Sequence, residues 1–279
     1  MTPSTLVGGH VFVAGGLAKG GLKYAGDIGA EVIQVFVTNP RGWALSAGDP
    51  SEDAKLRESG VPVFLHAPYL VNFGSPTAAT LDNSVAVVRH TLRRGVETGA
   101  RGVVVHTGSA VSQPREDALR QVREHVLPLL DELPGDGPDL LLEPMAGQGQ
   151  MLCATVQDLG PYLEALEGHP KVGVCLDTCH AFSAGHDLAS PEGVRETFDA
   201  LGELAPGRLK LIHANDSKDA CGSKKDRHEN IGSGHIGAQA FGEIMRHPVA
   251  AGVPVCIETP GKVEAHRQDI ETLKKLRGA

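Results

Sequence analysis

The chain has 279 residues, of which 41% are hydrophobic and only 4% aromatic, and its formal net charge is −8. This length is close to the ~250 residues typical of a (β/α)8 barrel, and the apolar content suits a sizeable, mainly aliphatic core. The acidic charge argues against indiscriminate coating of nucleic acid, although a DNA substrate stays open if several carboxylates bind metal ions. No apolar run reaches the ~18 residues of a membrane span, and no secretory signal is visible, so we expect a cytoplasmic protein without membrane contact.

The cysteines are odd in number and lie mostly in apolar runs, at Cys153, Cys175, Cys179, Cys221 and Cys256. They predict reduced core thiols and no disulfide framework. The spacing of Cys175 and Cys179 would also suit a pair of zinc ligands. We prefer the core-thiol interpretation, because the first of the two lies inside a strand-like run.

Strand-like and helix-like segments alternate along the chain. Short apolar or β-branched runs predict strands at residues 6–13, 31–37, 61–65, 102–105, 140–142, 172–176, 209–212 and 254–257. Apolar residues at spacings of three and four, or weaker helical patterns, predict helices at residues 17–28, 81–96, 119–130 and 263–276.

Capping signals predict the starts of two more helices. Thr155 and Asp158 form a capping box, and Ser190 supplies an N-cap directly before a proline and a glutamate. About eight alternations of strand and helix follow one another without a linker, a low-complexity tract or an obvious repeat. The prediction is therefore an α/β protein, a (β/α)8 TIM barrel that forms a single domain over residues 1–279.

Six successive predicted strands end on a histidine or an acid: His66, His106, Glu143, Asp177, His213 and Glu258. In a parallel barrel these strand ends meet at one mouth, where active sites are built. One or two such residues could be helix caps or core histidines, but carboxylates crowded together in register repel one another strongly. A cation removes this repulsion, and imidazole mixed with carboxylate favours zinc or another transition ion over magnesium or calcium.

Loops supply three further candidate ligands. His180 lies three residues beyond Asp177, and Asp226 and His228 lie in the polar segment that follows the seventh strand. An Asp-x-His pair in a polar loop is usually only solvated, but here the barrel mouth lies within its reach. The resulting nine ligands suffice for three metal ions if one carboxylate bridges two of them.

Two segments carry a family resemblance. GVCLDTCH at 173–180 and HANDSKDACGSKKDRHENIGSG at 213–234 resemble the signatures of the endonuclease IV family of apurinic/apyrimidinic endonucleases. The segments GGHVFVAGG at 8–16, HAPYLVNFGSP at 66–76 and EPMAGQG at 143–149 extend the resemblance over nearly the whole chain. It implies a TIM barrel with three Zn²⁺ ions, with Mn²⁺ an alternative at one of them. It also implies incision of DNA 5′ to an abasic site, leaving a 3′-OH and a 5′-deoxyribose phosphate, together with 3′-phosphodiesterase activity.

The resemblance also implies roles for single residues. One zinc would be held by His66, His106 and Glu143, a second by Glu143, Asp177, His213 and Glu258, and the third by His180, Asp226 and His228. As catalytic residues, Glu143 would anchor the metal pair and Glu258 would orient the attacking water. The chain departs from the family pattern at Thr107, Pro144, Met145 and His186.

The implied substrate is double-stranded DNA with abasic sites or blocked 3′ ends. Arg41, Tyr69 and Leu70 resemble the residues that enter the base stack and hold the abasic nucleotide out of it. Lys218, Lys224, Lys225 and Arg227 are expected phosphate contacts, although a solvated loop would explain these charges almost as well. We expect a monomer without an obligate protein partner, and His10 near the mouth without an assigned role.

Two alternatives are kept. A metal-dependent sugar isomerase or epimerase of the TIM-barrel type also carries histidine and carboxylate ligands at strand ends, but it needs neither the third ligand set nor the residues that enter DNA. A DNA-lesion binding module that retains metals without turnover is disfavoured, because no position of the ligand set is lost.

Overall fold

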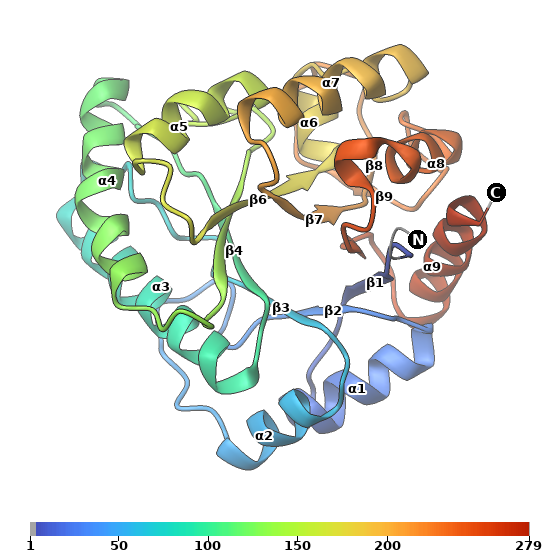
Figure 1. The fold of residues 1–279 in the computed structure, drawn as a ribbon, viewed down its shortest axis with the longest axis horizontal. Coiled ribbons are helices and arrows are strands. Elements are labelled where there is room, and N and C mark those ends of the chain that lie inside the picture. Colours follow the sequence, from blue (N-terminus) through green and yellow to red (C-terminus); the bar gives the residue numbers. More distant parts are fainter. Residues whose placement is uncertain (1–3, 279) are drawn as a thin grey trace.

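A computed structural model describes residues 4–278, in which eight parallel strands close into a barrel (Figure 1). The strands are β1 (Val7–His10), β2 (Ile33–Val35), β3 (Val63–His66), β4 (Gly102–His106), β5 (Asp139–Glu143), β6 (Val172–Asp177), β7 (Leu209–His213) and β10 (Val255–Ile257). They follow one another around the barrel in chain order, and β10 pairs with β1 to close it. The predicted fold class is confirmed.

Helices surround the strands (Figure 1). They are α1 (Leu17–Ile28), α2 (Pro50–Glu58), α3 (Ala78–Thr98), α4 (Arg115–Asp131), α5 (Leu159–Ala165), α6 (Thr178–Ala184), α7 (Pro191–Leu204), α8 (Ala238–Arg246) and α9 (Val263–Arg277). Two short 3-10 turns, η1 (Val156–Asp158) and η2 (Pro248–Ala250), and a small hairpin of β8 (Asp216–Ser217) and β9 (His228–Glu229) complete the structure. Helix α9 packs on α1 and β1, which completes the helical ring.

Several elements were not predicted from the sequence. Helix α2 buries only Asp53 and Leu56, so it has almost no apolar pattern, and α6 has only seven residues. Helix α8 and the β8–β9 hairpin also lie where no element was predicted. The first strand ends at His10, three residues before its predicted end, because the chain leaves the sheet there to enter a loop at the mouth.

Both caps predicted from the sequence are present in the structure. The capping box of Thr155 and Asp158 is present, although the first turn after it is a 3-10 turn. The side chain of Ser190 accepts a hydrogen bond from Gly193 N at the start of α7. All five cysteines are free, but Cys221 is exposed, so the expectation of core thiols fails for this residue, which lies in a polar loop.

The interior of the barrel has one apolar layer, made of Val32, Phe64, Val104, Leu141, Cys175, Leu211 and Cys256. Strand β1 contributes Gly8 at this level, where a Cβ atom would collide with the carbonyl oxygen of Val32. Side chains alternate along a strand, so the residue two positions further on again faces the interior, one layer nearer the mouth. These residues are His10, Gln34, His66, His106, Glu143, Asp177, His213 and Glu258. The alternation therefore places an entirely polar layer directly above the apolar one.

None of the helices in the described part of the chain combines the length and the apolar character that crossing a membrane requires.

Candidate metal centre

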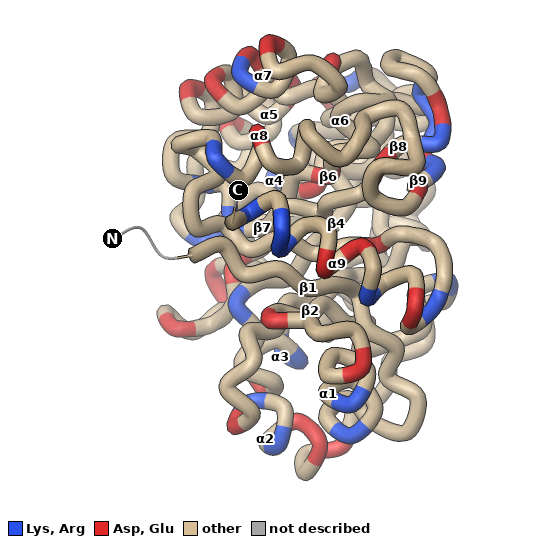
Figure 2. Tube along the Cα trace, turned by 90° about the vertical axis from the view of Figure 1, so that its right-hand side faces the viewer, with Lys and Arg blue, Asp and Glu red and all other residues tan. Residues whose placement is uncertain are grey.

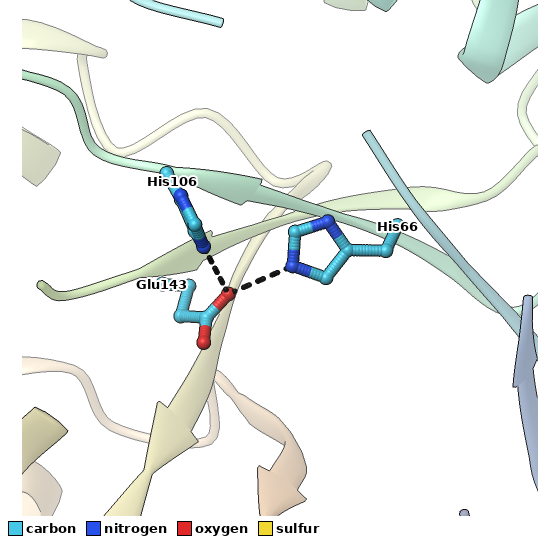
Figure 3. Close-up of side chains that lie close together, drawn as sticks. All are labelled: His66, His106 and Glu143. Atoms are coloured by element: carbon cyan, nitrogen blue, oxygen red, sulfur yellow. Dashed lines mark hydrogen bonds and ion pairs between the residues drawn. The ribbon is translucent and has the colours of Figure 1, made fainter. Parts of the chain in front are cut away.

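The polar layer gathers into clusters that could hold metal ions, and the first is formed by His66, His106 and Glu143. Both imidazole Nε2 atoms face one carboxylate oxygen, Glu143 Oε2, at 3.1 Å from His66 and 3.4 Å from His106 (Figure 3). The residues come from three adjacent strands, and His106 and Glu143 are directly paired in the register of β4 and β5. Three ligand atoms that converge in this way suit one transition ion.

The second cluster is formed by Glu143, Asp177, His213 and Glu258. His213 Nδ1 lies 3.1 Å from Glu143 Oε1, 3.4 Å from Glu258 Oε2 and 3.8 Å from Asp177 Oδ2. Glu143 thus directs one carboxylate oxygen to each of the first two clusters, as a carboxylate that bridges two ions would.

Two further groups overlap at His228: one is formed by Asp177, His180 and His228, the other by Cys179, Asp226 and His228. The predicted set of His180, Asp226 and His228 is therefore divided between them, and together they are called the third cluster. The loop residue Asp226 links the two groups. Its Oδ1 lies 3.3 Å from His180 Nε2 and 3.1 Å from His228 Nε2. Both of these nitrogens are buried and, among the described residues, neither has a hydrogen-bond partner. A buried polar atom without a partner is costly, and a cation would satisfy both nitrogens at once, so this donor set fits a transition ion.

The histidine rings are oriented by backbone carbonyls. The Nδ1–H groups donate to Ala67 O from His66 (2.6 Å), to Pro144 O from His180 (3.0 Å) and to Glu258 O from His228 (3.2 Å). Each of these bonds leaves the Nε2 lone pair facing a cluster, which is the arrangement that metal-binding histidines adopt.

Gln34 was missed by the sequence prediction. Its fully buried amide accepts a hydrogen bond from His213 Nε2–H (2.8 Å) and donates to Glu258 Oε1 (2.6 Å). His10 Nδ1 lies 3.0 Å from the same amide nitrogen and 3.4 Å from Glu258 Oε1, which places His10 at the mouth as expected. A signal was present in the sequence, because Gln34 is the one amide in the apolar run of residues 31–37.

Asn215 was also missed, and it joins two acids. Its Nδ2 donates to Asp177 Oδ2 (2.7 Å), and its Oδ1 accepts from Glu258 N (2.7 Å). The other oxygen of Asp177 caps helix α6 by accepting from His180 N (2.9 Å). Asp177 is therefore both the strand-end cap and a member of the second cluster.

Two buried acids anchor the loop that carries Asp226 and His228. Asp216 accepts hydrogen bonds from three backbone N–H groups of the returning chain, those of Gly232, Ile236 and Gly237. Asp269 of α9 accepts from Ile231 N, from Asn230 Nδ2 and from the hydroxyl of Thr259, which follows Glu258. The loop is thus tied both to itself and to the segment that carries Glu258.

Burial and the crowding of acids perturb the histidines in opposite directions. Burial lowers the pKa of His106 to about 4, with help from the neighbouring imidazoles and against the charge of Glu143. Burial also opposes protonation of His228, but the charges of Asp177 and Asp226 prevail and raise its pKa to about 9. The carboxylates of the mouth therefore attract positive charge strongly, and protons and metal ions compete for the same nitrogens.

The residues expected to enter DNA lie on the same face. Tyr69 is 45% exposed and stacks on the His106 ring, with centroids 5.6 Å apart and planes at 21°. Leu70 beside it is also exposed, and Tyr69 N donates to Pro40 O (3.0 Å), which ties this loop to the one that carries the exposed Arg41. The structure therefore places the loop of Arg41 beside the loop of Tyr69 and Leu70 at the mouth.

The cations of the β8–β9 loop are exposed, but two of them are paired with Asp219. Arg227 Nε donates to Asp219 Oδ2 at 2.6 Å, and Lys225 Nζ lies 3.4 Å from Asp219 Oδ1. Basic and acidic residues are interspersed along this loop (Figure 2). Arg227 is therefore bound to a carboxylate, whereas Lys218 and Lys224 form no ion pair among the described residues.

Three of the four departures from the family pattern have structural roles. The hydroxyl of Thr107 donates to Cys153 O (3.0 Å), and the carbonyl of Pro144 orients His180. His186 lies away from the clusters, because its Nε2 accepts from Val156 N (3.1 Å) at the start of η1. None of these substitutions removes a candidate ligand.

Comparison with known proteins agrees with the geometry of the mouth. Residues 22–276 match the family described as a xylose isomerase-like TIM barrel. Over 278 residues the chain is 61% identical to the "Probable endonuclease 4" of Streptomyces avermitilis, and the match covers 97% of this chain and 90% of that protein. The chain belongs to the endonuclease IV family.

Solved structures agree. Endonuclease IV from Thermus thermophilus superposes with a TM-score of 0.85 at 30% identity, over 97% of this chain and 98% of that one. A D-tagatose 3-epimerase-like protein superposes with a TM-score of 0.73 over 98% of this chain and 97% of that one, but at 18% identity it shares only the fold. The family resemblance of the signature segments is therefore confirmed.

The contacts of Gln34 lead to a prediction about metal binding. Gln34→Ala removes the acceptor for His213 Nε2–H and the donor to Glu258, so both side chains lose their fixed orientation. We expect zinc affinity at the second cluster to fall about 10- to 100-fold, as is typical when such a supporting group is lost. Equilibrium dialysis against buffered zinc, followed by elemental analysis, measures this loss. The exposed Gln150→Ala is the control, and equal zinc retention by both variants would show that Gln34 does not support the site.

Proposed function

We propose that the protein is a zinc-dependent DNA repair endonuclease that hydrolyses the phosphodiester 5′ to an abasic site, leaving a 3′-OH and a 5′-deoxyribose phosphate. The observation that carries the proposal is the set of three clusters, joined through Glu143 and Asp177, with the exposed Tyr69 stacked on His106 of the first cluster. Membership of the endonuclease IV family supports hydrolysis of DNA as the reaction class. Trimming of blocked 3′ ends is proposed as a second activity of the same site.

The nine candidate ligands would hold three Zn²⁺, with Mn²⁺ an alternative at one position. When bound, such ions acidify water and neutralise the charge that develops on phosphate oxygens and on the leaving O3′. The carboxylate of Glu143 would set the separation of two ions. Glu258, whose Oε1 is fixed by Gln34, would orient the attacking water toward phosphorus. As the new P–O bond forms, the P–O3′ bond would break, and a proton of the water would pass to the leaving O3′.

The residues around the metals would select the substrate. Burial, with the charges of Glu258 and Glu143, raises the pKa of Tyr69 above its usual value, so the phenol stays neutral and can donate a hydrogen bond. Tyr69, Leu70 and Arg41 would fill the gap in the base stack from which the abasic nucleotide is withdrawn. The formal charge of −8 would become about −2 with three Zn²⁺ bound (−8 + 6), which makes approach to phosphate easier.

The sugar isomerase or epimerase alternative is weakened by two observations. It has no use for the third cluster, in which Asp226 faces two histidines, nor for an exposed tyrosine and leucine at the mouth. The likeness to an epimerase-like structure is one of fold only. Assays of one preparation on an abasic duplex and on a panel of ketoses separate the two functions.

The first test is metal analysis coupled to nicking. We expect about three transition ions per chain, and loss of nicking of an abasic duplex after prolonged chelation, because all three clusters contribute ligands. Elemental analysis and a gel-based nicking assay measure both quantities. A stoichiometry near one, or full nicking by metal-free protein, contradicts the proposal.

Glu143→Gln tests the bridging role. A neutral amide cannot bind two dications as a carboxylate does, so we expect most of the nicking rate to be lost while abasic DNA still binds through the mouth residues. Single-turnover nicking and a binding titration on the same preparation give the comparison. A rate within about tenfold of the wild type, which is only about 1.4 kcal/mol of barrier, would mean that Glu143 does not bridge.

Tyr69→Ala and Arg41→Ala test the substrate-selecting role. Both variants should bind internal abasic duplex more weakly, because the gap in the stack is no longer filled. A blocked 3′ end requires no nucleotide to be held out of an intact stack, so its trimming should fall less. The ratio of the two activities, measured on one preparation, cancels errors in the active fraction. An equal loss of both activities, or a loss of metal, would assign these residues to support of the site.

The ion pair of Arg227 leads to a prediction about salt. Asp219→Asn frees the guanidinium of Arg227 and the ammonium of Lys225, so we expect tighter binding of abasic DNA at low salt and a salt dependence steeper by about one to two counter-ions. Titrations between about 50 and 200 mM salt measure the slope. Glu132→Gln, which opens the exposed pair with Arg89 at the end of α4, makes the same change in net charge and is the control. Equal slopes for both variants would show that neither Arg227 nor Lys225 contacts phosphate.

A further inference from the structure

His10 is the one histidine of the polar layer that belongs to none of the candidate metal clusters among the described residues. It ends β1, which lies between β2 and β10 in the closed barrel. On one side the register of β1 pairs His10 with Gln34. On the other side it pairs Gly9 with Ile257, the residue before Glu258. The fold therefore places His10 between Gln34 and Glu258, yet none of the roles described so far uses it.

Both hydrogens of the Gln34 amide nitrogen have a partner at this point of the mouth. Gln34 Oε1 accepts from His213 Nε2–H (2.8 Å), which leaves Nε2 as the donor atom. One hydrogen goes to Glu258 Oε1 (2.6 Å), and His10 Nδ1 lies 3.0 Å from the same nitrogen. Because an amide nitrogen only donates, His10 Nδ1 accepts the second hydrogen. Gln34 is fully buried, so solvent cannot readily replace a partner that is lost.

The bond to His10 fixes the plane of the amide. Two partners leave a planar amide free to tilt, whereas three partners in different directions define its plane. His10 Nδ1 and Glu258 Oε1 are both acceptors and lie 3.4 Å apart, so they repel unless a donor such as Gln34 Nε2 serves both. The His10 ring is itself packed on Phe36, with centroids 4.4 Å apart and planes at 43°. The acceptor therefore has a fixed position of its own.

We propose that His10 is a positioning residue for Glu258, and that it acts by fixing the amide of Gln34 through Nδ1. The inference rests on the proposed function, in which Glu258 orients the attacking water. In this role His10 touches neither the substrate nor a metal ion. Without it the amide tilts, so Glu258 Oε1 loses its fixed direction and His213 loses the acceptor that orients its ring toward the second cluster.

The test compares His10→Leu with His10→Asn. Leucine fills space without an acceptor, whereas asparagine carries Oδ1 close to the position of Nδ1. We expect His10→Leu to lower the single-turnover nicking rate about tenfold and zinc affinity at the second cluster about threefold to tenfold, with binding of abasic DNA within about twofold of the wild type. His10→Asn should recover most of both losses. Nicking gels, equilibrium dialysis with elemental analysis, and binding titrations measure the three quantities.

A double-variant cycle shows whether the effect passes through Gln34. In a Gln34→Ala background, His10→Leu should change zinc affinity and nicking by no more than about twofold, because no amide is left to position. His125→Leu on the outer helix α4 is the control for the loss of a histidine. The inference is overturned if His10→Leu keeps wild-type values, if His10→Asn recovers nothing, or if the loss is the same with and without Gln34.

Thermal unfolding of each variant separates positioning from instability. If His10→Leu unfolds early, His10→Ala, which adds no bulk, replaces it in every comparison. Zinc dialysis needs no substrate, so it is scored independently of nicking. If the wild-type protein does not nick abasic DNA, the proposed function fails, whereas a loss of zinc affinity that asparagine restores still supports the role of His10 at the Gln34 amide.

Discussion

The structure depends on one constraint: the carboxylates buried at the mouth must be compensated by positive charge. Glu143 and Asp177 are fully buried, and Glu258 lies beside them at the top of the barrel interior. Burial alone would raise the pKa of Glu143, but the charges of His213 and His106 and hydrogen bonds from His213 and His66 keep it well below the usual range. The site is therefore built for carboxylates that stay ionised, and such a group is tolerable only where cations or protonated imidazoles compensate it.

The alternation of side chains along each strand, with a period of two residues, produces this site. The same alternation that points Leu141 into the apolar interior points Glu143 into the layer above it, and this relation holds from β2 around to β10. A shift of one residue in any strand would turn a candidate ligand toward the helices and place an apolar side chain in the polar layer. The strand register therefore decides which side chains can reach a metal ion. Backbone carbonyls and the amides of Gln34 and Asn215 then fix the orientation of the candidate ligands.

Much of this arrangement could be predicted from the sequence, because each strand-end ligand follows a recognisable apolar run. Gln34 could have been found by carrying the same period into the run of residues 31–37. The hairpin that places His228 opposite Ser217 could not, because two-residue strands leave no pattern. Helix α2 was missed because it buries one apolar side chain, and α6 because its seven residues coincide with the ligand motif. The stacking of Tyr69 on His106 joins the loop after β3 to the end of β4 and follows only from the closed barrel.

The third cluster is the part of the candidate site that the strands of the barrel do not supply by themselves. The layer from the strands is a property of the scaffold and could serve several metal-dependent reactions, so fold alone does not choose among them. Asp226 and His228 are supplied by a loop, and a loop holds ligands in place only if its backbone is fixed. Asp216 fixes it by accepting from three of its N–H groups, and Asp269 ties it to the segment that follows Glu258. Asp216 and Asp269 form no ion pair among the described residues, and they hold the candidate ligands of the loop in register with those of the strands. The specific chemistry of the mouth therefore depends on them.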